Sequence, residues 1–276
     1  MTRILFVSEN GEPFPLPESL CSEASSEDIC VSFESEAAFS DSIRTLPPRG
    51  TLAVTDSDRT VLSCLAAKLP VVGYEHDGRR LSAPEIIQSL AEFTVGDYRE
   101  LYDALTGQSV YYQTNRFLFR GIPEEEFVEV YHMLYESPYG LAETDRDMSD
   151  SQIREMYKTR RTVSGMIGGF GPACLIDKAK NNLRIGYAAA YPEQLLADSA
   201  EAGSGLFLEY AVYPELRGLG HGTMLVSALC DALRALFPGE TLYARVHPDN
   251  TPSAAILKKL GFLPLPPNLY YLPKFR

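Results

Sequence analysis

A run of six residues, RGLGHG at 217–222, places glycine at every second position between two apolar segments, LFLEYAVYPEL and TMLVSALCDAL. Each glycine inside a helix would cost roughly 0.5 to 1 kcal/mol of stability, so three together indicate a need for bare backbone. A strand that enters a helix through such a turn leaves unpaired N–H groups at the positive end of the helix dipole. The segment therefore predicts a phosphate-binding turn, with an ordinary glycine turn as the alternative.

The spacing of these glycines excludes two familiar phosphate cradles. The run does not end in Gly-Lys-Ser or Gly-Lys-Thr, as a P-loop does. It also lacks the G-x-G-x-x-G pattern of dinucleotide sites, in which an acidic residue follows about 20 positions later. A different kind of strand, turn and helix is required.

The composition is that of a globular chain able to form one large or two smaller domains. Hydrophobic residues make up 45% of the 276 positions, and no apolar run approaches the ~18 residues of a membrane span. The start, MTRILFVSENGEPFPLP, reaches acidic and proline residues too early for a signal peptide, so we expect a cytoplasmic protein with no membrane partner. The five cysteines are scattered without a C-x-x-C pair, so neither disulfides nor a metal site is expected.

Charge is unevenly distributed along the chain. Residues 1–112 contain 8 Lys and Arg against 18 Asp and Glu, whereas residues 113–276 contain 17 against 19. This asymmetry predicts two domains, which we place at 1–110 and 114–276. Neither has a basic patch with interleaved aromatic residues, which argues against a nucleic-acid partner.

The first domain has α/β patterning. Short apolar strands alternate with helical patterns in the order RILFVSE, DICVSFE, TLAVTDS, DRTVLSCLAAKL, PVVGYEHDG, APEIIQSLAEF and VGDYRELYDALTG. We expect a parallel sheet, with Ser57 or Asp58 capping the helix after TLAVTDS and a ligand crevice at the same edge.

One stretch of this domain, TLAVTDSDRTVLSCLAAKLPVVGYEH, resembles the later half of a haloacid-dehalogenase-like, Rossmann-like domain. That family carries a nucleophile motif of two aspartates after its first strand, and here Ser8-Glu9-Asn10 takes its place. Asp56 and Asp58 are then expected to cap a helix start, and phosphatase chemistry is not expected.

The second domain begins after residues 105–114 (LTGQSVYYQT), which have no strong period and are expected to form the linker. A strand (NRFLFRGI), a helix from Pro123, another helix (SDSQIREMYKTRRT) and a hairpin (GPACLIDKAKNNLRIGYAAAY) follow, with the glycine-rich residues 165–171 as a flexible connection. From Gly205 the order is strand, RGLGHG loop, helix (TMLVSALCDALRALF), strand (TLYARVH) and the segment PDNTPSAAILKKLGF.

This order resembles the GNAT superfamily of acetyl-CoA-dependent N-acyltransferases. The pyrophosphate signature of that family, Arg/Gln-x-x-Gly-x-Gly/Ala, matches at Arg217, Gly220 and Gly222. A second signature comes 28 residues later, where Asn250 leads a helix that ends Leu-Gly-Phe at 260–262. The resemblance implies an α/β fold with a mixed, splayed sheet for residues 114–276, acetyl-CoA as co-substrate, no metal, and acetyl transfer to an amine.

The resemblance also implies which residues hold coenzyme A. The pyrophosphate would bind the Thr223 hydroxyl and the loop amides of Arg217, Gly218, Leu219, Gly220, His221 and Gly222. The pantetheine arm would pair with the backbone of Tyr210, Ala211 and Val212, where the strand splays from its neighbour at a bulge. The Val212 amide would stabilise the oxyanion, and Asn250 would form the opposite wall.

Acetyl transfer needs a base, because the attacking amine must be neutral. Glu209 is the candidate, since it interrupts the apolar run LFLEYAVY; an ion pair with a nearby arginine is the alternative interpretation. Many family members carry a tyrosine seven residues after the asparagine as the acid for the leaving thiolate, but this chain has Leu257 there. Tyr243, Tyr270 and Tyr271 are unranked substitutes for this acid. His221 and His247 flank the expected cleft and are further candidates for catalysis.

Two other functions stay open. Leu257 and the acidic first domain also fit a non-catalytic acyl-CoA-binding module, and the first domain could instead bind a phosphate ester or a nucleotide. The resemblance places acceptor choice in residues 120–165 and 191–205, whose charged residues form no recognisable code: Glu143, Asp145, Arg160 and Arg161. The sequence leaves open the amine acceptor and the oligomeric state, including a homodimer.

Overall fold

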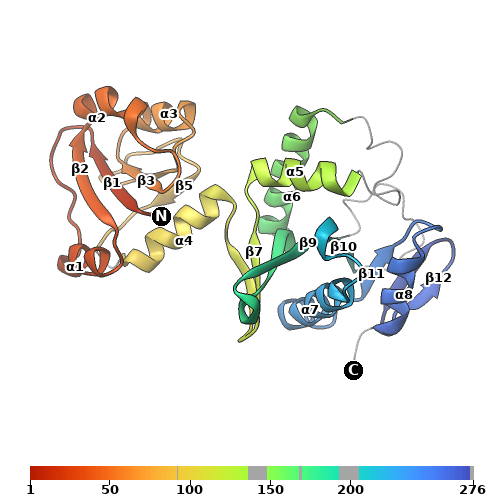
Figure 1. The fold of residues 1–276 in the computed structure, drawn as a ribbon. Helices are drawn as coiled ribbons and strands as arrows, with labels where there is room; N and C mark the ends of the chain where they lie inside the picture. Colours follow the sequence, from red (N-terminus) through yellow and green to blue (C-terminus); the bar gives the residue numbers. More distant parts are fainter. Residues whose placement is uncertain (92, 136–147, 168–169, 193–204, 274–276) are drawn as a thin grey trace. The chain divides into compact units, whose positions relative to one another are not determined.

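The computed structural model describes residues 1–91, 93–135, 148–167, 170–192 and 205–273. The chain divides into two compact units, Met1–Ser109 and Val110–Arg276. Figure 1 shows an α/β arrangement in each.

The first unit is built on a five-stranded sheet in the order β2-β1-β3-β4-β5. All neighbouring strands pair in parallel: β1 (Arg3–Ser8), β2 (Cys30–Ser35), β3 (Thr51–Thr55), β4 (Val71–Tyr74) and β5 (Glu85–Ile87). This is the flavodoxin-like order of a doubly wound sheet, so the expected α/β domain with a parallel sheet is present, while its Rossmann-like character stays a prediction.

Helices cover both faces of this sheet. Alternation along β1 directs Ile4 and Phe6 to a core shared with α1 (Glu18–Ser26) and α4 (Val95–Thr106). Leu5 and Val7 point to a second core, shared with α2 (Glu36–Ser42) and α3 (Asp58–Ala66). A short 3₁₀ turn, η1 (Ile43–Thr45), follows α2. Of the two candidate caps for α3, Ser57 fills the position, because its hydroxyl accepts a hydrogen bond from the Thr60 amide.

The second unit is built on an eight-stranded sheet in the order β12-β13-β11-β10-β9-β8-β7-β6. β10 and β11 pair in parallel, and the other described pairs are antiparallel. The strands are β6 (Val110–Gln113), β7 (Phe117–Gly121), β8 (Phe170–Asp177), β9 (Leu183–Pro192), β10 (Leu206–Val212), β11 (Leu242–Arg245), β12 (Leu263–Leu265) and β13 (Leu269–Leu272).

Helices pack on both faces of this sheet as well (Figure 1). On one face, α5 (Glu124–Tyr135) and α6 (Asp150–Ile167) form a core with Tyr187 and Ala189 of β9. On the other face, α7 (His221–Leu236) and α8 (Thr251–Lys259) pack with Ala188 and Leu208. Two 3₁₀ turns, η3 (Lys178–Lys180) and η5 (Pro214–Leu216), precede β9 and the glycine loop.

Several local expectations need correction. The expected linker 105–114 contains the end of α4 and the whole of β6. Tyr111 and Tyr112 of β6 pack on the core that the second unit forms with α7 and α8. The glycine-rich segment 165–171 is largely the end of α6 and the start of β8, with residues 168–169 outside the described part. APEIIQSLAEF contributes only the short strand β5 at the edge of its sheet.

Candidate active site

The central feature of the second unit is the separation of β10 from β11. The two strands pair only at Leu206 with Leu242 and Phe207 with Tyr243, whereas β10 stays paired with β9 along its whole length. The register between β10 and β9 is unbroken, so the expected bulge is not found on that side. The sheet splays because β11 leaves β10 after its second paired residue.

Within the described residues, the splay leaves backbone groups of β10 without a strand partner. The Leu206 amide bonds to Thr241 on the β11 side, and the Tyr213 amide bonds to Ile185 on the β9 side. Because hydrogen bonding alternates along an antiparallel pair, the amides of Tyr210 and Val212 point to the open side. Ala211, which we expected among the coenzyme contacts, turns its backbone to β9.

A glycine in β9 supports this end of β10. A Cβ at Gly186 would lie 2.9 Å from the Val212 Cα and would collide with the Ala211 carbonyl oxygen. Only glycine allows the two backbones to approach this closely, so Gly186 fixes the position of the Val212 amide.

The glycine loop follows β10 and opens α7. Gly218 and Gly220 have φ of +75° and +83°, values that favour glycine, and a Cβ on either would meet nothing within 4 Å. Gly220 is the N-cap of α7 and provides no side-chain cap. Among the described residues, the amides from 218 to 223 have no hydrogen-bond acceptor, so the loop presents free N–H groups at the helix start.

The third glycine of the run also has a packing role. A Cβ at Gly222 would lie 2.8 Å from the Cδ1 of Ile256, so this glycine permits α7 to pack against α8. The side chain of Arg217 is exposed, and its Nε donates to the Val212 carbonyl at 3.1 Å, which ties the loop to the open end of β10. Leu219 is 68% exposed at the tip of the loop.

Glu209 points to the face of the sheet that carries α5 and α6. Its carboxylate accepts two hydrogen bonds from Arg160 of α6, from Nη1 at 2.7 Å and from Nη2 at 3.0 Å. The Tyr187 hydroxyl donates to Oε2 at 3.1 Å. The ion pair that the sequence left as an alternative is therefore present, and the side chain of Glu209 remains 29% exposed.

Aromatic rings enclose the arginine of this pair. The guanidinium of Arg160 lies 5.0 Å from the ring centre of Tyr191 and 6.0 Å from that of Phe127. Burial alone would lower the pKa of Arg160, but the charge of Glu209 raises it above its ordinary value. Arg160 is thus a permanent cation. A carboxylate has about four lone-pair positions. Two of the three bonds to Glu209 are on Oε2 and one is on Oε1, so one position on Oε1 is left to accept a further hydrogen bond or a proton.

The second predicted signature forms the start of α8. The Asn250 side chain accepts a hydrogen bond from the Ser253 amide at 3.1 Å and so caps this helix. Leu257 is fully buried in the core, so this position offers no proton donor.

A tyrosine that sequence reasoning used only for its backbone lies close to α8. The Tyr210 hydroxyl forms a short hydrogen bond with the Ser253 hydroxyl. Burial raises the pKa of Tyr210 to about 12, although the bond to Ser253 opposes the rise. The spacing from Asn250 could not reveal this residue, because it comes from the strand and not from the helix.

The other residues that the sequence offered as acids or bases make contacts within the fold or lie on a strand. The Nδ1 of His221 donates to the Leu216 carbonyl at 3.1 Å, and its side chain is buried beneath the loop. Tyr243 stacks on Phe207 with ring centres 5.2 Å apart. His247 accepts the Asp249 amide in the turn before α8. Tyr270 and Tyr271 lie on β13.

In the first unit, polar groups gather at the carboxyl ends of β1, β3 and β4. The buried Asp56 carboxylate accepts the Glu9 amide at 2.8 Å and lies 3.2 Å from Nε2 of His76. Arg79 bonds to Glu9 at 2.5 Å and to the Asp56 carbonyl at 3.1 Å. Each group satisfies another, so this network acts as an internal brace.

Within the described ranges, no group of three or more His, Cys, Asp or Glu side chains could hold a metal ion. No helix in the described part of the chain is long and apolar enough to cross a membrane.

The family model for the acetyltransferase (GNAT) domain matches residues 116–263. The chain belongs to the GNAT acetyltransferase family. The match covers the splayed strands, the glycine loop and α8, and it leaves the first unit outside. No curated protein matches the chain.

Solved structures with a similar fold are distant in sequence. An acetyltransferase from Agrobacterium tumefaciens is 20% identical, with 59% of this chain and 94% of that one covered and a TM-score of 0.44. RimL, a ribosomal L7/L12 α-N-protein acetyltransferase in complex with coenzyme A, is 12% identical, with 60% and 98% covered and a TM-score of 0.44. YncA from Salmonella typhimurium, solved with its cofactor acetyl-CoA, is 18% identical, with 59% and 96% covered and a TM-score of 0.40. Similarity at this level identifies no substrate.

Proposed function

We propose that this chain transfers an acetyl group from acetyl-CoA to an amine. The observation that carries the proposal is the open edge of β10, where the amides of Tyr210 and Val212 lack a strand partner, next to free loop amides at the start of α7. An extended arm can pair with such an edge as an added strand, while its diphosphate binds the helix start.

Each part of the coenzyme has a matching group on the chain. The pyrophosphate fits the amides of residues 218–223 and the charge of Arg217, and the pantetheine arm fits the edge at Tyr210 and Val212. The Val212 amide would then lie near the thioester carbonyl, where it stabilises the negative charge that develops on oxygen during attack.

The proposed transfer forms an N–C bond and breaks the C–S bond of the thioester. The proton lost by the attacking amine goes to Glu209, directly or through a water, on the Oε1 position that Arg160 and Tyr187 leave free. The leaving thiolate takes a proton, and we assign that donation to the Tyr210 hydroxyl, which regains a proton from solvent while Glu209 releases the proton it took from the amine. With a pKa of about 12, Tyr210 stays protonated at neutral pH and is available as a donor.

The acceptor amine and the homodimer remain predictions. Much of the region expected to choose the acceptor, residues 136–147 and 193–204, lies outside the described residues, and with it Glu143 and Asp145. The haloacid-dehalogenase-like resemblance of residues 51–76 is likewise a prediction only.

A turnover assay tests the proposed function. Release of free thiol from acetyl-CoA is followed with a panel of amines: small alkylamines, polyamines, amino sugars and peptides with a free N-terminus. Thiol release that depends on one of these amines, with the acetylated amine found by mass spectrometry, supports the proposal.

A non-catalytic acyl-CoA-binding module is the second candidate, favoured by the buried Leu257 at the position of the usual acid. Calorimetry with coenzyme A separates the two. Binding of coenzyme A without thiol release for any amine would favour the binding module, and absence of both would contradict both candidates.

A further inference from the structure

The first unit contains a small cavity that the GNAT reaction does not use. It has a volume of about 100 Å³ and lies over the carboxyl ends of β1 and β2, beneath the segment that leads from β1 to α1. In a sheet with this strand order the usual ligand crevice lies between β1 and β3, so this cavity is on the other side of β1. The neighbouring space between β1 and β3 is filled by the Asp56, His76 and Arg79 network, which leaves the side of β2 as the hollow part.

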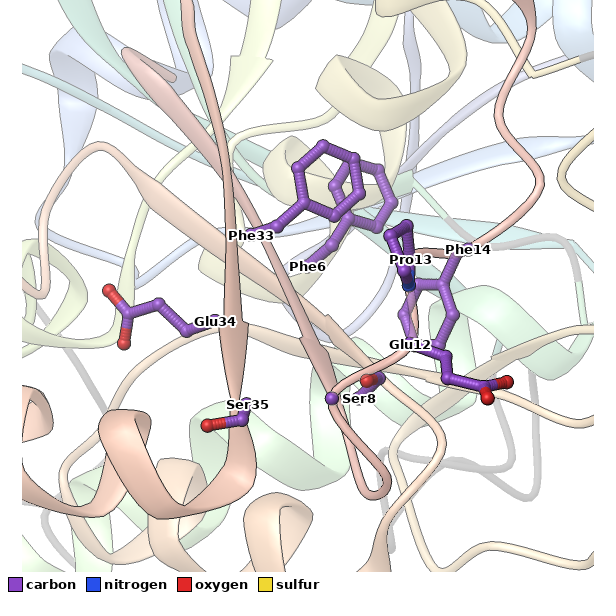
Figure 2. Close-up of a pocket in the computed structure, with 9 residues that line it drawn as sticks. Phe6, Ser8, Glu12, Pro13, Phe14, Phe33, Glu34 and Ser35 are labelled. Atoms are coloured by element: carbon purple, nitrogen blue, oxygen red, sulfur yellow. The ribbon is translucent and has the colours of Figure 1, made fainter.

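Three phenylalanines form one part of the cavity wall. Phe6 and Phe33, which face each other across β1 and β2, stack with ring centres 5.2 Å apart, and Phe14 meets Phe6 edge-on at 6.0 Å. Figure 2 shows the rings of Phe6 and Phe33 together at one end, with Phe14 and Pro13 beside them. Phe33 is 46% exposed, an unusual exposure for a phenyl ring in a strand.

A hydroxyl lies at the other end of the cavity. Ser8 lines the space, although the residue as a whole is only 7% exposed. A hydroxyl that lines a cavity can accept a hydrogen bond from a ligand.

The charge around the cavity is negative. Glu12 and Glu34 belong to its lining and no Lys, Arg or His does. The Glu34 carboxylate is directed away from the rings and accepts a bond from Ser42, which leaves Glu12 as the acidic side chain beside the cavity (Figure 2). The first 112 residues contain 18 acidic and 8 basic side chains. An anion would be repelled here, whereas a cation gains both from the acidic surface and from the faces of the rings.

From the cavity, its rings and its hydroxyl, we infer that the first unit binds a small alkylammonium ion. The ligand places its methyl or methylene groups against Phe6, Phe14 and Phe33 and donates its N–H to the Ser8 hydroxyl. The volume of about 100 Å³ is sufficient for one such head group. The inference is independent of the proposed acetyl transfer, because the cavity and the open edge of β10 belong to different units.

The test compares three probes of the same shape and different charge on the full chain: trimethylammonium, tert-butanol and trimethylacetate. Binding is followed through the ring resonances of ¹³C-labelled phenylalanine at constant ionic strength. We expect trimethylammonium to shift the Phe6, Phe14 and Phe33 signals with a dissociation constant on the order of 1 mM, reasonable for a ligand of so few atoms. We expect tert-butanol to bind at least about tenfold more weakly and trimethylacetate not to bind.

Variants identify the groups involved. Phe33→Leu keeps an apolar wall but removes the ring, and should weaken the binding of trimethylammonium about tenfold. Ser8→Ala should also weaken this binding. Leu62→Ala is the matched control, because Leu62 is 62% exposed in the same unit and does not line the cavity. It should leave the affinity unchanged.

Three results would overturn the inference: equal binding of tert-butanol and trimethylammonium, unchanged affinity in Phe33→Leu, or no saturable shift with any probe. Failure of the proposed acetyl transfer is measured separately. Gly220→Asp should leave trimethylammonium binding intact, and Phe33→Leu should leave coenzyme A binding intact.

Discussion

The two units differ in whether the polar groups at the ends of their strands are hydrogen-bonded within the fold. In the first unit, the side chains at the carboxyl ends of β1, β3 and β4 bond to one another: Asp56 to the Glu9 amide and His76, and Arg79 to Glu9. In the second unit, the open side of β10 and the loop before α7 present backbone amides that bond to nothing in the described chain.

This difference shows which kind of feature identifies a working edge. Charged residues are denser at the strand ends of the first unit, yet their network is closed. The second unit has few charges there, but it brings the free N–H groups of a helix start next to a stretch of strand that its neighbour has left. Unsatisfied backbone is therefore the better guide to the site in this chain.

Gly220→Asp, in the loop before α7, should have the largest effect on coenzyme A binding. The variant places a side chain at φ +83° and a negative charge at the helix start, where the diphosphate would bind. We expect coenzyme A binding to fall below detection by calorimetry. Gly239→Asp is the matched control, since Gly239 has φ +89° with open space around it and follows the far end of α7. Equal loss of binding in both variants would mean that general destabilisation, not the loop, is responsible.

Glu209→Gln should come next in size. General base catalysis typically contributes about 10² to 10⁴-fold, so turnover should fall by that factor while coenzyme A affinity stays near that of the wild type. The acidic limb of the pH profile of kcat/KM should shift or vanish with it.

The ion pair with Arg160 requires a control for Glu209. Removing one partner of a buried pair leaves the other charge unpaired, which can cost several kcal/mol. In the double variant Arg160→Gln with Glu209→Gln no charge is left over, so it should recover stability in urea but not turnover. Recovery of turnover in the double variant would show that Glu209 is structural.

Tyr210→Phe should have a smaller effect. Loss of the hydroxyl removes the assigned proton donor, and we expect kcat to fall by about tenfold, near the lower end of acid-base contributions. Coenzyme A affinity should be unchanged, because the backbone of Tyr210 makes the proposed contact. Ser253→Ala, which removes the bonding partner of the Tyr210 hydroxyl, is a useful comparison. A Tyr210→Phe variant with the kcat of the wild type would leave the acid unidentified.

The sequence was sufficient for the order of the main elements and for the location of the loop. The pattern of the RGLGHG run and the helix after Asn250 depends on local backbone needs, and local needs are visible in sequence. The sequence also indicated two domains, since the difference in net charge persists over about a hundred residues.

Other features depend on contacts between distant residues and were not visible. Gly222 is needed because Ile256, 34 positions later, packs against it. Arg160 reaches Glu209 across 49 positions, so the sequence could propose an arginine partner but not name it. The hydroxyl of Tyr210 near α8 became visible only when β10 was placed beside that helix.

The closed network of the first unit predicts the smallest effect, a pH dependence of local stability. The hydrogen bond to Asp77 raises the pKa of His76, burial opposes the rise, and the bond to Asp56 adds to it. A histidine whose pKa is higher in the folded state stabilises the fold fully below the unfolded value of about 6.5. That contribution is lost as the pH rises through the folded-state value. Because His76 is partly exposed, we expect its contribution to local stability to be less than about 1 kcal/mol.

Hydrogen exchange of the Glu9 amide, corrected for the intrinsic rate, should show weaker protection at pH 8 than at pH 6. His76→Gln should remove the difference, and if the variant keeps the same pH dependence, another group controls this edge.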